Sequence, residues 1–450
     1  MKALVIAAGE GKRFRERGYK GVKPLYSLLG LSLLERTLLS LREAGVKEVV
    51  VVLGYRGEEI KAKIGSGDKW GIKVDYVVNE RWFLGNGISV LSAREFFQNE
   101  ESFLLTMADH IWDLQALTRI AELKPNPGEV YVGADYKLEE IVDLEEATRL
   151  QVEGIKIRRI GKGLKDFNAV DCGVFHATPY IFEILAKAEK EGKYTLSEAL
   201  QIMAEEGNLL AADIGESWWI DVDTPEEAIR AEQILLKFLP APKDGLIARY
   251  INRRFSLFLT RWLARTDIHP NQISLISFIL CLGGAFLFGL GLSPAGGILA
   301  QLASIVDGVD GEIARLKFLR SAWGEFLDAM LDRYGDGILI IGMALGAYDG
   351  NNGQTVFCWL SLALLGAPMS MLIKEKFRNI WGQLYLPEKE GIWANLLLGN
   401  RDGRLFVIML AGIFHSPLWG LAILAITSHL LTFIRIVNIR KFCPADGDIN

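Results

Sequence analysis

The stretch that decides the fold of the second half of the chain is residues 307–332, DGVDGEIARLKFLRSAWGEFLDAMLD. Asp307 and Asp310 are three residues apart and Asp328 and Asp332 are four apart, so on helices each pair shares a face. Four unpaired carboxylates in membrane-embedded helices would repel one another and would be costly to bury. A divalent metal cluster offsets both penalties, and oxygen ligands suit Mg²⁺, Mn²⁺ or Ca²⁺. The spacing therefore favours a metal site over acids exposed at a helix end.

The sequence around this stretch is apolar and predicts a bundle of membrane helices. Among the connections between the apolar segments, only alternate ones hold Lys or Arg, which the positive-inside rule explains by six crossings with both ends cytoplasmic. Residues 245–266 hold five Arg and no acid, with apolar residues at helical spacing. They predict an amphipathic helix in the cytoplasmic headgroup layer, or alternatively a basic helix packed on the protein itself. The six predicted crossings are approximately 271–292, 294–317, 321–348, 353–379, 404–415 and 416–438.

Charge separates this region from the residues before it. The chain has 450 residues and a net charge of −5. Residues 1–243 carry 32 Lys and Arg against 39 Asp and Glu (−7), and the remainder carries 18 against 16 (+2). Neither part has the cationic excess of a nucleic-acid binder.

The four cysteines are far apart in the sequence, and their spacing favours neither disulfides nor a zinc site. The apolar run at the start of the sequence is too short for the core of a signal peptide, so the first domain is expected in the cytoplasm.

The first half reads as an α/β domain. Residues 2–8 form an apolar run that predicts a buried strand, and a glycine-rich turn, Gly9-Glu10-Gly11-Lys12-Arg13, follows it. Such a turn can direct backbone N–H groups at a phosphate, but it is neither a Walker nor a Rossmann motif. Strands are also expected at 48–53, 74–78, 103–107 and 217–220, alternating with helices in a mainly parallel sheet. Ligands gather at the carboxyl ends of such strands, where Asp109 and Asp221 lie; Asp223 is expected to cap the next helix.

Four motifs in residues 1–235 resemble those of the sugar-phosphate nucleotidyltransferase family: AAGEGKRF, KPL at 23–25, MADH at 107–110 and WIDVDTPEEA at 219–228. The resemblance implies a Rossmann-like fold in which Gly9, Gly11 and Arg13 hold the nucleoside triphosphate. It also implies that Lys23 stabilises charge on the α-phosphate and that Asp109 and Asp221 hold the catalytic metal. Residues 86–89 and 161–162 resemble the phosphocholine- and inositol-phosphate cytidylyltransferase branch. Lys162 and Lys165 would suit the acceptor phosphate, with a solvated surface charge as the alternative.

Residues 307–332 are similar, position by position, to the DGxxAR…GxxxDxxxD signature of the CDP-alcohol phosphotransferase family. The resemblance to this family covers about residues 265–440. The resemblance implies that Asp307, Asp310 and Asp328 bind metal, while Asp332 is the general base and also a candidate ligand. It further implies that the nucleotide is lined by Gly311, Ala314, Arg315 and Gly324. The expected architecture is an α/β Rossmann-like nucleotidyltransferase domain (1–235), a linker with an amphipathic interfacial helix (236–268) and an all-α six-helix transmembrane domain (269–450).

A fusion of these two families implies coupled chemistry, in which the first domain makes a CDP-linked alcohol and the second consumes it. The implied first reaction joins CTP and inositol-1-phosphate into CDP-inositol and releases pyrophosphate. The implied second reaction transfers the phosphoinositol group of CDP-inositol to a second inositol-1-phosphate and releases CMP, in compatible-solute synthesis. Mg²⁺ or Mn²⁺ is the expected cofactor, the lipid bilayer and a homodimer are expected partners, and nucleic acid is not. An acceptor phosphate needs cations, for which we select Lys374, Arg404 and Arg435. The alternatives are a lipid-headgroup enzyme, and a nucleotide-gated transporter or scaffold.

Overall fold

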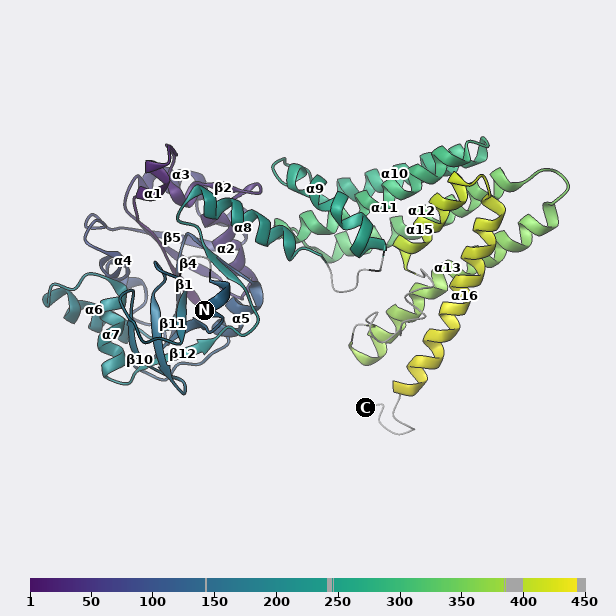
Figure 1. Cartoon of the computed structure of the whole chain (residues 1–450). Coiled ribbons are helices and arrows are strands. Elements are labelled where there is room, and N and C mark those ends of the chain that lie inside the picture. The colour runs from purple at the N-terminus through teal and green to yellow at the C-terminus, as the bar shows by residue number, and fades with distance from the viewer. Residues whose placement is uncertain (142–143, 241–244, 246, 384, 386–399, 443–450) are drawn as a thin grey trace. The chain divides into compact units, whose positions relative to one another are not determined.

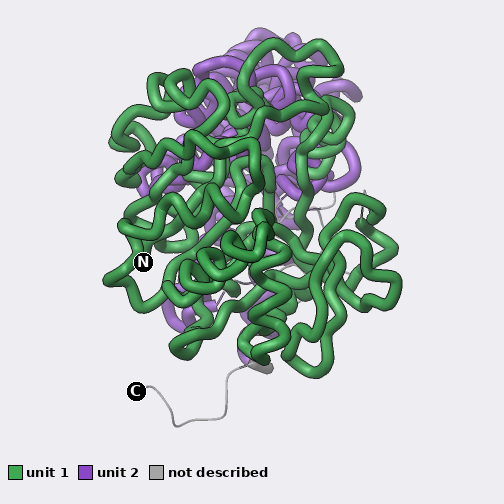
Figure 2. Tube along the Cα trace, turned by 90° about the vertical axis from the view of Figure 1, so that its left-hand side faces the viewer, with its two compact units in different colours: residues 1–234 green, residues 235–450 purple. Residues whose placement is uncertain are grey.

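The computed structural model describes residues 1–141, 144–240, 245, 247–383, 385 and 400–442 (Figure 1). The chain divides into two compact units, Met1–Ile234 and Leu235–Asn450 (Figure 2). Each unit has its own hydrophobic core: one lies on the sheet of the first unit, and the other lies between the helices of the second.

The first unit is built on a nine-stranded sheet with the strand order β5-β4-β1-β6-β11-β8-β12-β10-β9. The four strands from β5 to β6 are parallel, as the continuous apolar runs of β1, β4 and β6 predict. Beyond β6 the sheet is mixed, because β11 runs antiparallel to both of its neighbours, so the expectation of a mainly parallel sheet holds only for the first part. The strands are β1 (Lys2–Ala7), β4 (Glu48–Leu53), β5 (Lys73–Val78), β6 (Phe103–Met107), β8 (Val130–Asp135), β9 (Arg149–Glu153), β10 (Lys156–Gly161), β11 (Ala169–Ala177) and β12 (Leu209–Asp213).

Two small ribbons accompany this sheet. One pairs β2 (Ser27–Leu28) with β3 (Leu31–Ser32). The other pairs β7 (His110–Trp112) with β13 (Trp219–Asp221) in antiparallel register, so that Asp221 stands opposite His110. The strand expected at 217–220 is therefore one to two residues later and belongs to this ribbon rather than to the main sheet.

Helices accompany the sheet, and several of them begin at a side chain that caps them. The Ser32 hydroxyl accepts from Glu35 N while the Glu35 carboxylate accepts from Ser32 N, a capping box that starts α2. Before α8, the Thr224 hydroxyl and the Glu227 side chain make the equivalent bonds. The helices are α1 (Lys12–Glu16), α2 (Leu33–Glu43), α3 (Gly57–Ile64), α4 (Asn86–Ser92), α5 (Leu114–Ala121), α6 (Tyr180–Lys190), α7 (Leu196–Glu205) and α8 (Pro225–Lys237), which ends just past the unit boundary.

The described part of the second unit is helical. A π-helical turn, η5 (Ala248–Asn252), leads into α9 (Arg253–Leu263), and six further helices occupy the ranges predicted to cross the membrane. Of these, α10, α13 and residues Pro417–Arg440 of α16 are long and apolar enough to span a bilayer, whereas the six-crossing count stays a prediction. The six helices are α10 (Pro270–Gly289), α11 (Ser293–Leu316), α12 (Ala322–Ala347), α13 (Gly353–Trp381), α15 (Arg401–Ile413) and α16 (Pro417–Phe442).

Candidate active sites

The glycine-rich turn after β1 is tied sterically to the lysine of the KPL motif. Gly11 has φ +63°, a left-handed conformation that favours glycine, and it forms the N-terminal boundary of α1. A Cβ placed on Gly11 would come within 2.7 Å of Lys23 Cβ, whereas one on Gly9 would meet open space. The Lys23 side chain is buried and begins the short 3₁₀ helix Lys23–Leu25. The turn and Lys23 thus form one wall of a site at the carboxyl end of β1.

Opposite Lys23 lies a group of side chains that can hold a metal ion. Asp109 follows β6, and the pairing of β7 with β13 brings Asp221 beside it; Asp109, His110 and Asp221 each offer a ligand atom, and these atoms lie within 4.8 Å of one another. Lys23 Nζ donates to Asp109 Oδ2 at 2.7 Å. His110 Nδ1 lies 2.9 Å from Asp109 Oδ1 and 3.7 Å from Asp221 Oδ1. Asp221 Oδ1 is buried and accepts no hydrogen bond from the described residues, which fits a divalent cation.

The electrostatics of this group are strongly coupled. Burial alone would lower the pKa of Lys23, but Asp109, Asp221 and Asp223 outweigh burial and raise that pKa. Burial would likewise lower the pKa of His110, yet the charges of Asp221 and Asp109 raise it to about 9. Burial raises the pKa of Asp221 to about 7. The raised pKa of Asp221 means that full ionisation of this group of carboxylates is unfavourable. A bound cation would make that ionisation favourable.

A second ring of charges surrounds the first. The Asp223 carboxylate binds Lys23 Nζ and accepts from Arg13 Nη1 at 2.9 Å. Thr224, not Asp223, supplies the side chain that caps α8, so the expected capping role of Asp223 is wrong and its carboxylate belongs to the site. Arg13 Nη2 and Lys162 Nζ both contact Glu146 Oε2, at 2.7 and 3.3 Å. The structure thus brings Arg13, Lys23 and Lys162 together, while Lys165 lies exposed three residues beyond Lys162.

The second unit contains the other predicted carboxylate group. Asp307 and Asp310 on α11 and Asp328 on α12 each offer an oxygen, and these oxygens lie within 4.8 Å of one another. Ser274 Oγ donates to Asp310 Oδ2 at 2.5 Å and so orients that carboxylate. Asp328 Oδ1 is buried and receives no hydrogen bond from any described residue. Three carboxylates with an unsatisfied buried oxygen fit a hard divalent ion.

An arginine of α15 reaches into this carboxylate group. Arg401 Nη1 lies 2.5 Å from Asp307 Oδ1 and 2.8 Å from Asp332 Oδ1, and Arg401 Nε lies 3.3 Å from Asp336 Oδ1. Asp336 also accepts from Arg404 Nη2 at 2.6 Å. Asp332 is therefore held next to a guanidinium, and Asp336 anchors the two arginines of α15.

Lys374 and Arg435, the other two cations predicted to bind the acceptor phosphate, both make hydrogen bonds within the second unit. Lys374 Nζ donates to Asn400 Oδ1 at 3.0 Å, next to Arg401. Arg435 is 1% exposed and donates to both oxygens of Ser370, one turn before Lys374 on α13. Arg435 is thus placed inside the helix bundle, which argues against a purely interfacial anchor.

The glycines of the signature have different surroundings. A Cβ on Gly311 would come within 3.1 Å of Arg315 Nη1, and one on Gly324 within 3.2 Å of Asn271 Oδ1 at the start of α10. Ala314 and Arg315 are half-buried. A Cβ on Gly308, by contrast, would meet Arg253 and Ser256 of α9.

Four residues of these sites were not selected from the sequence: His110, Glu146, Asp223 and Arg401. Local signals existed for two of them, since His110 follows Asp109 directly and Asp223 follows Asp221 by two. Arg401 and Glu146 are distant in sequence from their partners, and only the fold brings them near.

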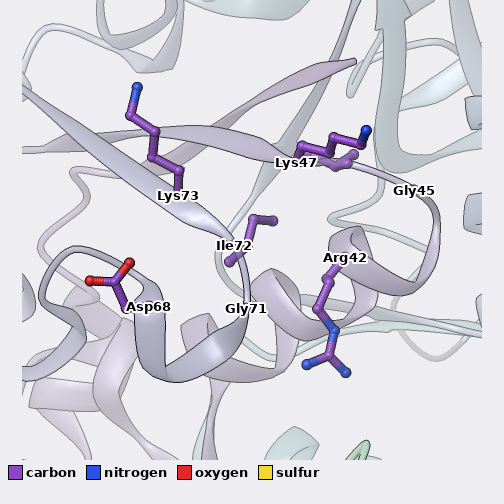
Figure 3. A pocket seen from close by; sticks show the side chains of 8 residues that line it. Arg42, Gly45, Lys47, Asp68, Gly71, Ile72 and Lys73 are labelled. Carbon is purple, nitrogen blue, oxygen red and sulfur yellow. The ribbon is translucent and has the colours of Figure 1, made fainter.

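A hollow elsewhere on the first unit contains none of the predicted residues. It lies at the amino ends of β4 and β5, the opposite edge of the sheet, and Arg42, Lys47, Asp68 and Lys73 line it (Figure 3). Lys73 pairs with Asp75 and Arg42 with Glu43. This hollow is therefore separate from the carboxylate group of the first unit.

Comparison with known proteins agrees with this division. The Nucleotidyl transferase family model matches residues 2–237, and the CDP-alcohol phosphatidyltransferase family model matches residues 267–381. Three curated proteins named bifunctional IPC transferase and DIPP synthase match nearly the whole chain. The one from Rubrobacter xylanophilus is 37% identical, covering 94% of this chain and 92% of its own. Those from Thermococcus kodakarensis (32%; 97% and 95%) and Aquifex aeolicus (31%; 98% and 98%) are also similar over their full lengths.

Proposed function

The chain belongs to the family of bifunctional IPC transferases and DIPP synthases, and from this membership we propose the two reactions that its two units perform. In the first, CTP and inositol-1-phosphate give CDP-inositol and pyrophosphate. In the second, CDP-inositol and another inositol-1-phosphate give a phosphorylated di-inositol phosphate and CMP. The observation that carries the proposal is that each unit holds its own group of ligand atoms within 4.8 Å. The names of the relatives favour an inositol phosphate over a lipid acceptor.

In the first unit we assign binding and charge stabilisation to the residues around Lys23. The backbone of the Gly9–Gly11 turn and Arg13 would hold the triphosphate. Attack of the inositol-1-phosphate oxygen on the α-phosphorus builds negative charge on the phosphoryl oxygens, which the Lys23 ammonium would stabilise. Lys162, which already shares Glu146 with Arg13, and Lys165 would bind the acceptor phosphate.

In the second unit we assign proton abstraction to Asp332. Its carboxylate would take the proton of the acceptor hydroxyl as that oxygen attacks the β-phosphorus of CDP-inositol, and CMP would leave. Arg401 lies 2.8 Å from Asp332 Oδ1, so it would hold this base in place. Gly311, Ala314, Arg315 and Gly324 would line the nucleotide, and Lys374, Arg404 and Arg435 would bind the acceptor phosphate.

Both families use divalent metal, and we propose Mg²⁺ or Mn²⁺ in both units. The ligands would be Asp109 and Asp221 in the first unit, and Asp307, Asp310 and Asp328 in the second, with Asp332 as an additional candidate. When bound, the metal would neutralise phosphate charge and polarise the phosphoryl oxygens. We further propose that the second unit crosses a cell membrane six times, with both termini on the cytoplasmic side. A homodimer stays a prediction.

The test is to incubate the purified protein with Mg²⁺, CTP and inositol-1-phosphate and to follow the products by phosphorus NMR. The wild type should release pyrophosphate and CMP and form a new phosphodiester. Asp328→Asn should stop at CDP-inositol, because the second carboxylate group is broken while the first is intact. Glu325→Gln, one turn earlier on α12 and exposed, is the matched control and should behave as the wild type.

Accumulation of CDP-inositol by the wild type would show that the acceptor is wrong and would make a lipid the leading candidate. If CTP were not consumed at all, the proposed substrates of the first unit would be wrong.

A further inference from the structure

Glu312 is a fully buried acid that the proposed mechanism leaves without a role. It occupies a variable position of the signature, between Gly311 and Ile313, and it is 0% exposed. A buried carboxylate is costly unless hydrogen bonds and a counter-charge satisfy it. The structure supplies both from one source, which is α9.

Three residues on one face of α9 donate to Glu312. Arg253 Nη1 and Ser256 Oγ lie 2.5 and 2.7 Å from Oε1, and Thr260 Oγ1 lies 2.5 Å from Oε2. Ser256 and Thr260 are themselves fully buried. Both oxygens of the carboxylate are thus engaged by a helix that precedes the membrane helices in sequence.

The contact between α9 and α11 continues away from Glu312. Arg253 Nη1 also lies 3.3 Å from Gly308 O, and a Cβ on Gly308 would come within 3.0 Å of Arg253 Nη1. Further along, Asn252 Nδ2 donates to Ser304 Oγ at 2.9 Å and Gln301 Nε2 donates to Asn252 Oδ1 at 2.6 Å. We call this set of contacts the α9–α11 seam; on α11 it consists of Gln301, Ser304, Gly308 and Glu312.

The seam and the metal-ligand carboxylates lie on different faces of α11. At about 100° per residue, Asp310 points about half a turn away from both Gly308 and Glu312. Any rotation of α11 that moved Asp307 and Asp310 away from Asp328 of α12 would therefore break the bonds of Glu312 on the other side. The seam fixes the direction in which the carboxylates point.

The opposite face of α9 is apolar and uncovered within the described residues. Phe255, Phe258 and Trp262 are 57–63% exposed, and arginines flank them. Such a face suits the membrane interface, so α9 combines the two arrangements that the sequence left as alternatives. A helix held at the membrane interface would restrict the movement of α11, to which it is hydrogen-bonded.

We propose that Glu312 is a positioning residue of the phosphotransferase site: by binding α9 through three donors, it holds α11 so that Asp307 and Asp310 face Asp328. This inference rests on the metal-binding role that the proposed function gives those carboxylates. Glu312 touches neither substrate nor metal in this role. Its effect on the chemistry passes through the orientation of α11.

The test compares Glu312→Gln, Thr260→Val and Thr260→Ser in the full chain reconstituted in lipid nanodiscs. Thr260→Val keeps the shape of the side chain and removes the donor, whereas Thr260→Ser keeps the donor and is the matched control. The first readout is hydrogen–deuterium exchange of residues 253–263. The second is Mn²⁺ binding by electron paramagnetic resonance, with Asp109→Asn added to every protein to remove the site of the first unit.

We expect Glu312→Gln and Thr260→Val to speed exchange in α9 and to weaken Mn²⁺ binding about tenfold, the lower end of the effect of losing a supporting partner of a metal ligand. Thr260→Ser should match the parent protein in both. Faster exchange with unchanged Mn²⁺ affinity would overturn the proposal, because α9 would then be held by Glu312 without serving the site.

A separate readout distinguishes this proposal from the proposed function. CMP release from CDP-inositol and inositol-1-phosphate is measured on the same variants without the Asp109→Asn change. If the wild type released no CMP but the Mn²⁺ results came out as expected, the reaction assigned to the second unit would be wrong and the role of Glu312 would stand.

Discussion

Lys23 is the residue on which the proposed chemistry of the first unit depends most. It is buried, it contacts Asp109 and Asp223, and these acids keep its pKa raised, so the ammonium stays charged at any working pH. Lys23→Gln should reduce CDP-inositol formation by about 10²–10³-fold, the usual cost of removing one group that stabilises transition-state charge. Pyrophosphate release measures this step. CMP release from added CDP-inositol should be unchanged.

Lys12 provides the control for this substitution, since it begins α1 directly after the glycine-rich turn but its side chain is 78% exposed. Lys12→Gln should keep most of the first activity. Equal losses in the two variants would mean that the general positive charge around the site matters rather than the position of Lys23.

Gly11 and Gly9 should differ sharply in their tolerance of alanine. Gly11→Ala places a side chain at φ +63° and within 2.7 Å of Lys23 Cβ, whereas Gly9→Ala meets open space. The backbone strain alone should cost about 1–2 kcal/mol of stability, and the close contact should add to it. Thermal unfolding without nucleotide should show a lower Tm for Gly11→Ala only. The idea fails if Gly9→Ala is equally destabilised.

His176 joins two elements of the first unit, because it lies on β11 and contacts the end of α5. Its Nδ1 lies 3.0 Å from Ile120 O and its Nε2 lies 2.9 Å from Ser102 Oγ, so a neutral ring donates to the carbonyl and accepts from the hydroxyl. Burial lowers the pKa of His176 below its ordinary 6.5. Below pH 6.5 the unfolded chain therefore binds a proton that the folded chain resists.

The contribution of His176 to stability should be complete above pH 6.5 and should be lost as the pH falls below that value. His176→Gln removes this proton uptake, so the difference in Tm between wild type and variant should shrink on acidification from pH 7.5 to 5.5. Scanning fluorimetry across this range measures it. A constant difference would show that the ring is protonated equally in both states.

At the scale of elements, the sequence predicted what depends on short-range pattern. The ranges 48–53 and 103–107 are β4 and β6 as the structure has them, because strands buried on both faces are continuous apolar runs. The grouping of Asp307 with Asp310 likewise follows from helical spacing. The mixed part of the sheet was not foreseen, because β11 is almost wholly buried and its residues do not tell in which direction the strand runs.

The rest of the candidate sites depends on contacts that spacing does not encode. Arg401 contacts Asp307 and Asp332 only because α15 packs beside α11 and α12 in the bundle. Asp223 is a residue type that commonly caps helices. Its contact with Lys23 forms only because the fold brings the first and last parts of the unit together. The packing of Gly308 against Arg253 and Ser256 likewise follows only from the position of α9.

At the scale of the whole molecule, an active first unit on one chain should supply CDP-inositol to an active second unit on another chain. CDP-inositol is soluble, and each unit has its own core and its own carboxylate group. A mixture of Lys23→Gln and Asp328→Asn proteins should therefore form the final phosphodiester although neither variant does so alone. Phosphorus NMR at several protein concentrations follows the reaction, and no product from the mixture would indicate that CDP-inositol passes within one chain.

The α9–α11 seam also changes where one would cut the gene to transplant the membrane enzyme. The matched CDP-alcohol phosphatidyltransferase segment begins at residue 267, after α9 has ended. A chimera that joined a foreign domain at that point would leave Glu312 without Arg253, Ser256 and Thr260, its three donors. The smallest fragment that keeps these contacts thus starts before residue 248. It includes η5 and α9 together with the membrane helices, instead of leaving them with the linker.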